Sequence, residues 1–143
     1  AGNSRLDTIQ AIVANNMLKK INKITNTRIK NANLYDSYLS DIKGIQVPRR
    51  LNHNKQVFHL YIVKAKHRNK LQKYLNSHNI DAKIHYPIPM HLQPAAKKYG
   101  YKNGDFPKAE NLCKSVISLP VHEFINKNDV KFISKKIKEF YSN

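Results

Sequence analysis

The sequence predicts a mixed α/β (α+β) fold, in which a long N-terminal helix precedes a region of short strands and helices. Two observations lead to this fold class. Apolar residues recur every three or four positions over residues 5–43, which is the period of an amphipathic helix. Beyond residue 44, short segments rich in β-branched and aromatic residues alternate with segments of helical period. A length of 143 residues fits one ordinary domain.

The apolar pattern of residues 5–43 describes one long helix or two helices nearly in line. Ser4 followed three residues later by Asp7 has the form of a capping box at the start of this helix. Gly44 can end the helix, because glycine readily adopts the left-handed conformation that often follows a helical end. The positions that carry the pattern are Leu6, Ile9, Val13, Met17, Ile21, Ile24, Ala32, Tyr35, Leu39 and Ile42.

The remaining elements are short. β-branched and aromatic composition predicts three strands, at residues 57–63, 82–85 and 116–118. Helical spacing predicts helices over residues 71–79 and 130–140. A turn at residues 104–107 leads into another helix, with Pro107 in its first turn and Glu110 near its N-terminus.

The charge of the chain is strongly positive, with 26 Lys and Arg against 9 Asp and Glu and a formal net charge of +17. Only five of these cations are arginines, the residue that base and bidentate phosphate recognition favours. The lysines are scattered, and no run of five or more marks a binding tail. Asn and Ile are also abundant, and both share A/T-rich codons with Lys. We therefore favour a solvated basic surface over a nucleic-acid-binding face.

Cysteine content and hydropathy indicate a cytoplasmic protein without a membrane partner. Cys113 is the only cysteine, so no intramolecular disulfide can form and a reducing compartment is the simplest setting. The longest apolar stretches, such as residues 11–14, are too short to span a bilayer. The start of the sequence has no apolar core of a signal peptide.

The segment from His85 to His91, His-Tyr-Pro-Ile-Pro-Met-His, is the most unusual part of the chain. Its two prolines restrict the backbone and make the segment stiff. A stiff loop with two imidazoles and a phenol can hold polar groups against a ligand at a small ordering cost, although a rigid connector has the same pattern. We expect no metal site, because these histidines lack a nearby Cys or carboxylate ligand and no CxxC or HExxH motif exists.

Asn3, Ser4 and Arg5 precede the long helix, where free backbone N–H groups favour an anion such as phosphate. The alternative is that Asn3 or Ser4 simply caps the helix. The sequence contains no P-loop, GxGxxG motif, nucleophile elbow or pair of carboxylates. Cys113, the only thiol, falls in a segment where a buried, inert role is expected. We nominate no catalytic residue.

Several motifs, in their order and spacing, resemble the C-terminal part of the DegT/DnrJ/EryC1/StrS family of fold-type I aminotransferases. These enzymes depend on pyridoxal 5'-phosphate (PLP) and act on nucleotide-linked keto-sugars. The motifs are Asn3-Ser4-Arg5-Leu6-Asp7, Gln10-Ala11, Arg28 with Ala32 and Tyr35, His59-Leu60-Tyr61, the ten residues from His85 to Pro94, Gly104-Asp105-Phe106-Pro107 with Ala109-Glu110, and Ser118-Leu119-Pro120.

The resemblance implies a long connecting helix over residues 1–44 and a small C-terminal α/β domain over residues 45–143, with a small, mostly antiparallel sheet flanked by helices. It implies that Asn3 binds the phosphate of the neighbouring subunit's PLP in a homodimer. It also makes His85, Tyr86 and His91 candidate contacts to the nucleotide-sugar substrate, with glutamate as the amino donor.

The large family domain, which carries the Schiff-base lysine, has no counterpart in these residues. We therefore expect a fragment of an enzyme of cell-surface polysaccharide biosynthesis that binds no PLP and is inactive alone. Two alternatives stay open: a basic module that binds nucleic acid or another polyanion, and a non-catalytic remnant of a decayed gene. Steep salt dependence of DNA binding would indicate the first alternative.

Overall fold

A three-stranded antiparallel sheet forms the centre of residues 5–142, which are the residues that the computed structural model describes. The strand order is β1-β2-β3, and Tyr61 of β2 lies opposite Leu119 of β3. The mixed fold class and the antiparallel sheet are confirmed. The strands are β1 (Ile45–Gln46), β2 (Tyr61–Ala65) and β3 (Val116–Leu119).

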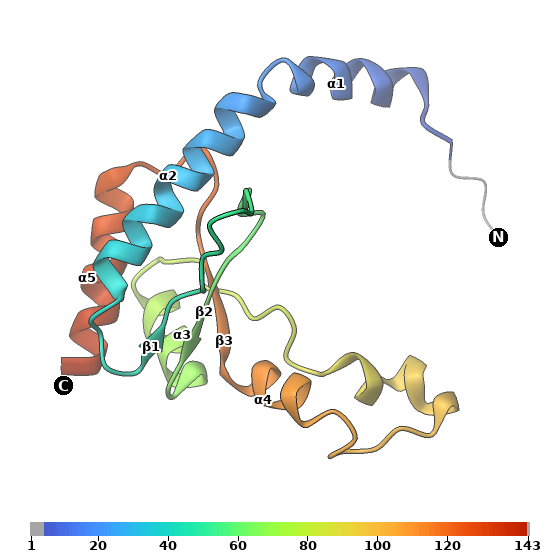
Figure 1. Ribbon diagram of the computed structural model, residues 1–143, viewed down its shortest axis with the longest axis vertical. Helices are drawn as coiled ribbons and strands as arrows, with labels where there is room; N and C mark the ends of the chain where they lie inside the picture. Colours follow the sequence, from blue (N-terminus) through green and yellow to red (C-terminus); the bar gives the residue numbers. More distant parts are fainter. Residues whose placement is uncertain (1–4, 143) are drawn as a thin grey trace.

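Helices surround this sheet, and Figure 1 shows α2 and α5 running side by side. α3 also contacts α5 and the sheet, whereas α4 leads directly into β3. The helices are α1 (Thr8–Leu18), α2 (Ile21–Leu39), α3 (Arg68–Ser77), α4 (Pro107–Ser115) and α5 (Lys127–Ser142), with short 3-10 turns η1 (Met90–Leu92) and η2 (Pro94–Tyr99).

The predicted N-terminal helix is two helices, separated at Lys19 and Lys20. Figure 1 shows α1 turned away from the line of α2, so the two are less nearly collinear than the sequence predicts. Asp7 caps α1, and its backbone N–H donates to Gln10 Oε1 at 3.1 Å. The predicted cap Ser4 and the predicted phosphate contact Asn3 lie outside the described residues.

The end of α2 also differs from the prediction, because the helix stops at Leu39 rather than at Gly44. The chain then turns so that Ile45 can enter the sheet opposite Ala65. The backbone carbonyl of Gly44 accepts a hydrogen bond from the N–H of Lys66 at 2.8 Å. The apolar period continues through these residues because Ile42 is buried in the core without being helical.

The apolar side chains of α1 are largely exposed among the described residues. None of the residues of α1 is buried, whereas α2 buries Ala32, Tyr35 and Leu39. Figure 1 shows α1 extending away from the rest of the fold. The exposed apolar side chains of α1 and its flanks are Leu6, Ile9, Ile12, Val13, Met17, Leu18 and Ile21.

Of the three predicted strands, the one at residues 116–118 is confirmed, the one at residues 57–63 is shifted, and the one at residues 82–85 does not form; the two-residue strand β1 was not predicted. Residues 116–118 lie in β3, whereas the strand predicted at residues 57–63 begins only at Tyr61. Phe58 has a φ of +51°, which interrupts the extended backbone before β2. The segment over residues 82–85 is reduced to one bridge, between Lys83 and Ser118. The helices predicted after Pro107 and over residues 71–79 and 130–140 are confirmed as α4, α3 and α5.

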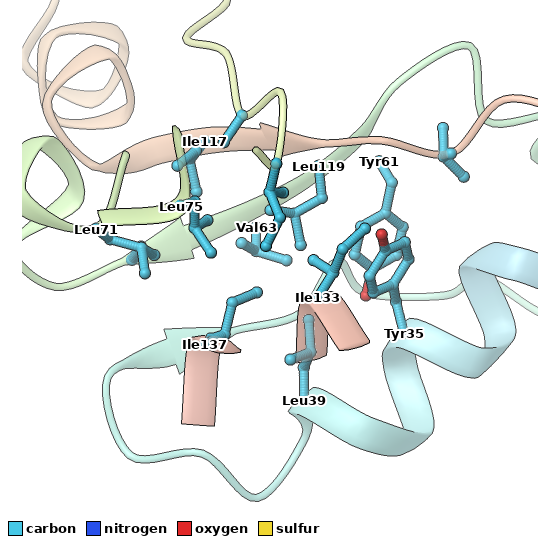
Figure 2. Packing of buried hydrophobic residues seen from close by; sticks show 14 of the residues in the cluster. Tyr35, Leu39, Tyr61, Val63, Leu71, Leu75, Ile117, Leu119, Ile133 and Ile137 are labelled. Carbon is cyan, nitrogen blue, oxygen red and sulfur yellow. The ribbon is translucent and has the colours of Figure 1, made fainter. Parts of the chain in front are cut away.

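The hydrophobic core joins α2, α3 and α5 to one face of the sheet (Figure 2). Tyr35 of α2 stacks on Tyr61 of β2, with ring centroids 4.8 Å apart. Both hydroxyls are satisfied: Tyr35 donates to the Pro120 carbonyl at 2.9 Å, and Tyr61 donates to Asp36 Oδ1 at 2.8 Å. The other large side chains that are fully buried are Leu39, Val63, Leu71, Leu75, Ile117, Val130 and Ile137.

Across the described part of the chain, no helix combines the length and the apolar character that a transmembrane span requires.

Gly44 provides a test of this packing, because it has a φ of +107° and lies against the ring of Tyr141. A Cβ at this position would lie 2.7 Å from Tyr141 Cε1, and the hydroxyl of Tyr141 is held by the Lys66 carbonyl at 2.6 Å. We expect Gly44→Ala to cost the left-handed penalty of about 1–2 kcal/mol and a further loss from displacing Tyr141. The free energy of unfolding in urea measures this loss.

Gly100→Ala is the matched control. Gly100 also has a positive φ, +74°, but an added Cβ there would meet no described heavy atom within 4 Å. Its cost should therefore be the conformational penalty alone. Equal losses for the two variants would contradict the packing of Tyr141 on Gly44.

Candidate functional site

The unusual histidine- and proline-rich segment belongs to an arm that we define as residues 85–106. The arm connects the strand-like segment at Lys83 with α4 and contains η1 and η2. Figure 1 shows it projecting away from the sheet. Neither η1 nor η2 contributes a residue to the hydrophobic core. Polar contacts must therefore account for much of the order of the arm.

His85 and Tyr86 lie together at the base of the arm. The ring nitrogen Nδ1 of His85 is 2.9 Å from the hydroxyl oxygen of Ser118, a residue of β3. Ser118 itself is held to Lys83 by two backbone hydrogen bonds of 2.8 and 3.1 Å. The Tyr86 ring lies edge-on to His85, with centroids 5.7 Å apart, and 67% of the residue is exposed. Tyr86 therefore presents its phenol to solvent from a fixed base.

The contact between Ser118 and His85 does not form a catalytic dyad open to substrate. A serine nucleophile needs an accessible hydroxyl and a base that is itself oriented by a third group. Ser118 is only 4% exposed. No described carboxylate orients the His85 ring, whose recorded polar partner is Ser118. The contact is that of a structural anchor.

His91 lies in a different environment from His85 and Tyr86. Its Nε2 is 3.1 Å from Glu110 Oε1, and both side chains are nearly buried, at 8% and 7% exposure. The His91 ring packs against Phe106 with centroids 4.8 Å apart. A carboxylate only accepts hydrogen bonds, so Nε2 of His91 carries the donated proton. Only Nδ1 of His91 is left to face another group.

Glu110 of α4 binds three residues of the arm, a role that its position near a helix N-terminus did not predict. Besides His91, its Oε1 accepts from the backbone N–H groups of Gly104 at 2.8 Å and Phe106 at 3.3 Å. These bonds lower the pKa of the Glu110 carboxyl, Gly104 most strongly, although burial opposes the shift. An acid in the first turn of a helix can reach back to free N–H groups, which is the signal that could have identified it.

A groove of about 720 Å³ lies beside the base of the arm. Its lining combines apolar residues such as Leu119 and Phe132 with four imidazoles, those of His59, His78, His85 and His122. Among the described residues, His85 is the predicted site residue that lines it; Tyr86 and His91 do not. Imidazole N–H groups above an apolar floor can bind a ligand that has both polar and apolar parts.

Arg28 of α2 binds two segments beside this groove, residues 58–59 and residues 122–125, which we call the rim. Its guanidinium pairs with Glu123 at 3.0 Å and donates to the backbone carbonyls of Phe58 and His59 at 3.3 and 3.2 Å. Asn31, one turn further along α2, donates to the carbonyls of two more rim residues. The rim is therefore fixed by the same helix that packs on the sheet.

The model of the DegT/DnrJ/EryC1/StrS aminotransferase family matches residues 1–138. The chain belongs to the DegT/DnrJ/EryC1/StrS aminotransferase family. The family resemblance inferred from the motifs is thereby confirmed, and members of this family depend on PLP.

Several known proteins are similar in sequence to this chain. It is 34% identical to a pleiotropic regulatory protein of Geobacillus stearothermophilus, over 97% of the chain and 38% of that relative. It is 31% identical to a dTDP-3-amino-3,4,6-trideoxy-alpha-D-glucose transaminase of Streptomyces venezuelae, over 96% of the chain and 36% of the relative. The chain thus spans little more than a third of the length of these relatives and matches their C-terminal part.

Solved structures of the DegT/DnrJ/EryC1/StrS family show the same fold. S. venezuelae DesV, in complex with a ketimine intermediate, matches all of this chain and 38% of its own, with a TM-score of 0.95 and 30% identity. A family aminotransferase from Brucella abortus matches 99% of this chain and 37% of its own, with a TM-score of 0.90 and 32% identity.

The described residues do not fit the PLP cofactor of the DegT/DnrJ/EryC1/StrS family. A PLP site needs a lysine for the Schiff base and an acid facing the pyridine nitrogen. The lysine at the groove, Lys83, is exposed and paired with Asp81 at 3.0 Å. Lys136 is the one described lysine that is not classed as exposed, and it is bonded to Glu139 at 2.8 Å. Nor do the described residues include a cluster of three or more potential metal ligands.

The acid-base behaviour of Glu110 tests the geometry of the arm. The pKa of Glu110 is lower in the folded chain than in the unfolded chain. Its hydrogen bonds therefore stabilise the fold at pH values above the pKa of the unfolded chain, and this stabilisation is lost as the pH falls through the pKa of the folded chain. We expect a carboxyl ¹³C NMR titration of Glu110 to give a midpoint below the ordinary glutamate value of 4.5. In the same titration, the Gly104 amide signal should move with Glu110. A midpoint at or above 4.5 would show that these bonds do not form.

Proposed function

We propose that this chain forms part of the substrate site of a PLP-dependent aminotransferase that acts on nucleotide-linked keto-sugars in cell-surface polysaccharide biosynthesis. Family membership supports the reaction class. The names of several relatives support the substrate class, since they are transaminases of dTDP- or UDP-linked sugars or, in Bacillus subtilis, a spore coat polysaccharide biosynthesis protein. We place the enzyme in the cytoplasm, where Cys113 would stay reduced.

The proposal rests on one observation about particular residues: Tyr86 is held beside the groove with its ring exposed. His85 lines the groove and is anchored to Ser118, and Tyr86 follows it directly with an exposed ring. Imidazole N–H and phenol O–H groups can donate to the oxygens of a diphosphate or a sugar. The Tyr86 ring also offers a face on which a nucleotide base can stack. We assign direct substrate contact to His85 and Tyr86.

His91 would contact the substrate only through Nδ1, because its Nε2 is occupied by Glu110. In the whole enzyme we assign to Asn3 the phosphate contact to the neighbouring subunit's PLP, within a homodimer that uses glutamate as amino donor. PLP, when bound, supplies the electron sink for amino transfer. The described residues form no site for it, and we assign them no step of that chemistry.

Binding of a nucleotide sugar to this chain tests the proposal. The probes are UDP-N-acetylglucosamine and dTDP-glucose, added up to about 10 mM, a concentration at which a weak, partial site is populated. We expect localised NMR shifts of the His85 and Tyr86 rings, and a loss of affinity of at least about fivefold in Tyr86→Ala. A fivefold loss equals about 1 kcal/mol, within the range of a base-stacking contact.

Tyr99→Ala is the matched control, because Tyr99 is also exposed on the arm, at 64%, but lies in η2. It should leave the affinity unchanged. Absence of shifts at His85 and Tyr86, or an equal loss of affinity in both variants, would contradict the assignment.

A second test concerns the cofactor. We expect borohydride reduction of the chain with PLP to label exposed lysines weakly at many positions, and to give no transamination with glutamate. The reason is that the described lysines are exposed, or bonded to an acid in the case of Lys136, rather than enclosed in a pocket. A stoichiometric adduct at one defined lysine, accompanied by turnover, would overturn this expectation.

A further inference from the structure

The arm presents several large side chains to solvent. Between His85 and His91, Tyr86 is 67% exposed, Ile88 49% and Met90 82%. Side chains that are this exposed contribute little to holding a segment in place, since they bury little apolar area. The geometry of the span between the two histidines must therefore come from the ends of the span and from its backbone.

Each end of the span is held by one imidazole. At the first end, His85 is anchored to Ser118 of β3, and so to the sheet. At the second end, His91 is anchored to Glu110 of α4. Between these points, Pro87 and Pro89 restrict the backbone. The two histidines, which the sequence suggests as a pair of ligand contacts, are thus the two fixed points of a stiff span.

Glu110 is the stronger of the two anchors, because one oxygen joins three positions of the arm. Its Oε1 accepts from His91 Nε2, Gly104 N–H and Phe106 N–H, at 3.1, 2.8 and 3.3 Å. Hydrogen bonds to a charged acceptor are stronger than neutral ones, and exclusion of water strengthens them further. Only 7% of the Glu110 side chain is exposed, and the Phe106 ring lies over His91.

We propose that Glu110 is a positioning residue, which sets the orientation of Tyr86 and of the span from residue 86 to residue 90 through its bond to His91. Its effect on substrate binding rests on the proposed function. Its effect on the order of the arm does not, because the contacts that produce that order lie within this chain. The hydrogen-bond partners of Glu110, which are His91, Gly104 and Phe106, do not line the groove.

The test compares Glu110→Gln and His91→Phe with the unchanged chain. Glutamine keeps the size of the side chain and an oxygen for the two amides, but it lacks the negative charge. Phenylalanine keeps the packing on Phe106 but has no N–H to donate. Glu139→Gln is the control, because it removes the charge of another hydrogen-bonded glutamate, which pairs with Lys136 in α5 and lies outside the arm.

Two readouts separate positioning from general stability. Backbone ¹⁵N relaxation should show the order parameters of the Tyr86, Ile88 and Met90 amides falling from near 0.85 to below about 0.6 in both variants. Pro87 and Pro89 have no N–H and give no such signal. The cooperative thermal transition should persist with its midpoint lowered by only a few degrees, because hydrogen bonds of the arm are lost while the hydrophobic core is untouched. The affinity for UDP-N-acetylglucosamine should fall about three- to tenfold, while Glu139→Gln changes neither the order of the arm nor the affinity.

Each outcome decides one part of the inference. Unchanged order of residues 86–90 in Glu110→Gln and His91→Phe overturns the positioning role. If the arm becomes mobile in these variants while the affinity for the probe is unchanged, Glu110 has no positioning role in substrate binding. If the unchanged chain binds no probe, the proposed function fails, and the relaxation data alone then decide whether Glu110 orders the arm. If Glu110→Gln unfolds, the positioning role is decided on His91→Phe.

Discussion

The packing of α2 against the sheet is the interaction on which the rest of this structure depends. Tyr35 and Tyr61 stack between helix and strand, and their hydroxyls reach the end of β3 and Asp36. Burial raises the pKa of both phenols, so they remain neutral donors at any physiological pH. Arg28 and Asn31, earlier on the same helix, hold the chain segments around the groove. One helix thus supports both the core and the rim of the candidate site.

The arm follows a different physical principle from the core. Its side chains contribute little to the hydrophobic core. Its order comes from the carboxylate of Glu110, the anchors at His85 and His91, and the prolines that restrict the backbone between them. Such a segment is preorganised without being packed in the core, so binding a ligand would cost little conformational entropy for ordering it. Because so few contacts hold the arm, its order is sensitive to the loss of a single hydrogen-bond acceptor.

The exposed apolar face of α1 and the poor fit to PLP are consistent with a chain that covers little more than a third of the length of its relatives. Within the described residues, the structure provides a stable core, a groove with imidazole donors and a stiff presenting arm. Among the described residues, the lysine at the groove, Lys83, is exposed and paired with Asp81 rather than enclosed. The chain therefore shares its sequence and fold with the family, while the chemistry assigned to its residues is limited to binding and orientation.

The sequence by itself determined the features that depend on local pattern. The helical periods of α2, α3 and α5, the strand character of β3, the stiffness of the segment between His85 and His91 and the family motifs can all be recognised from neighbouring residues. Tertiary structure alone decided features that depend on residues far apart. The carbonyls of Phe58 and His59 accept hydrogen bonds from Arg28 instead of extending β2. The break between α1 and α2 falls at a point where the apolar period of the sequence continues unchanged. His91 likewise pairs with Glu110, 19 positions away, because folding brings η1 to the first turn of α4. No local pattern encodes such a contact, since its free energy is gained only when the chain between the two residues has closed.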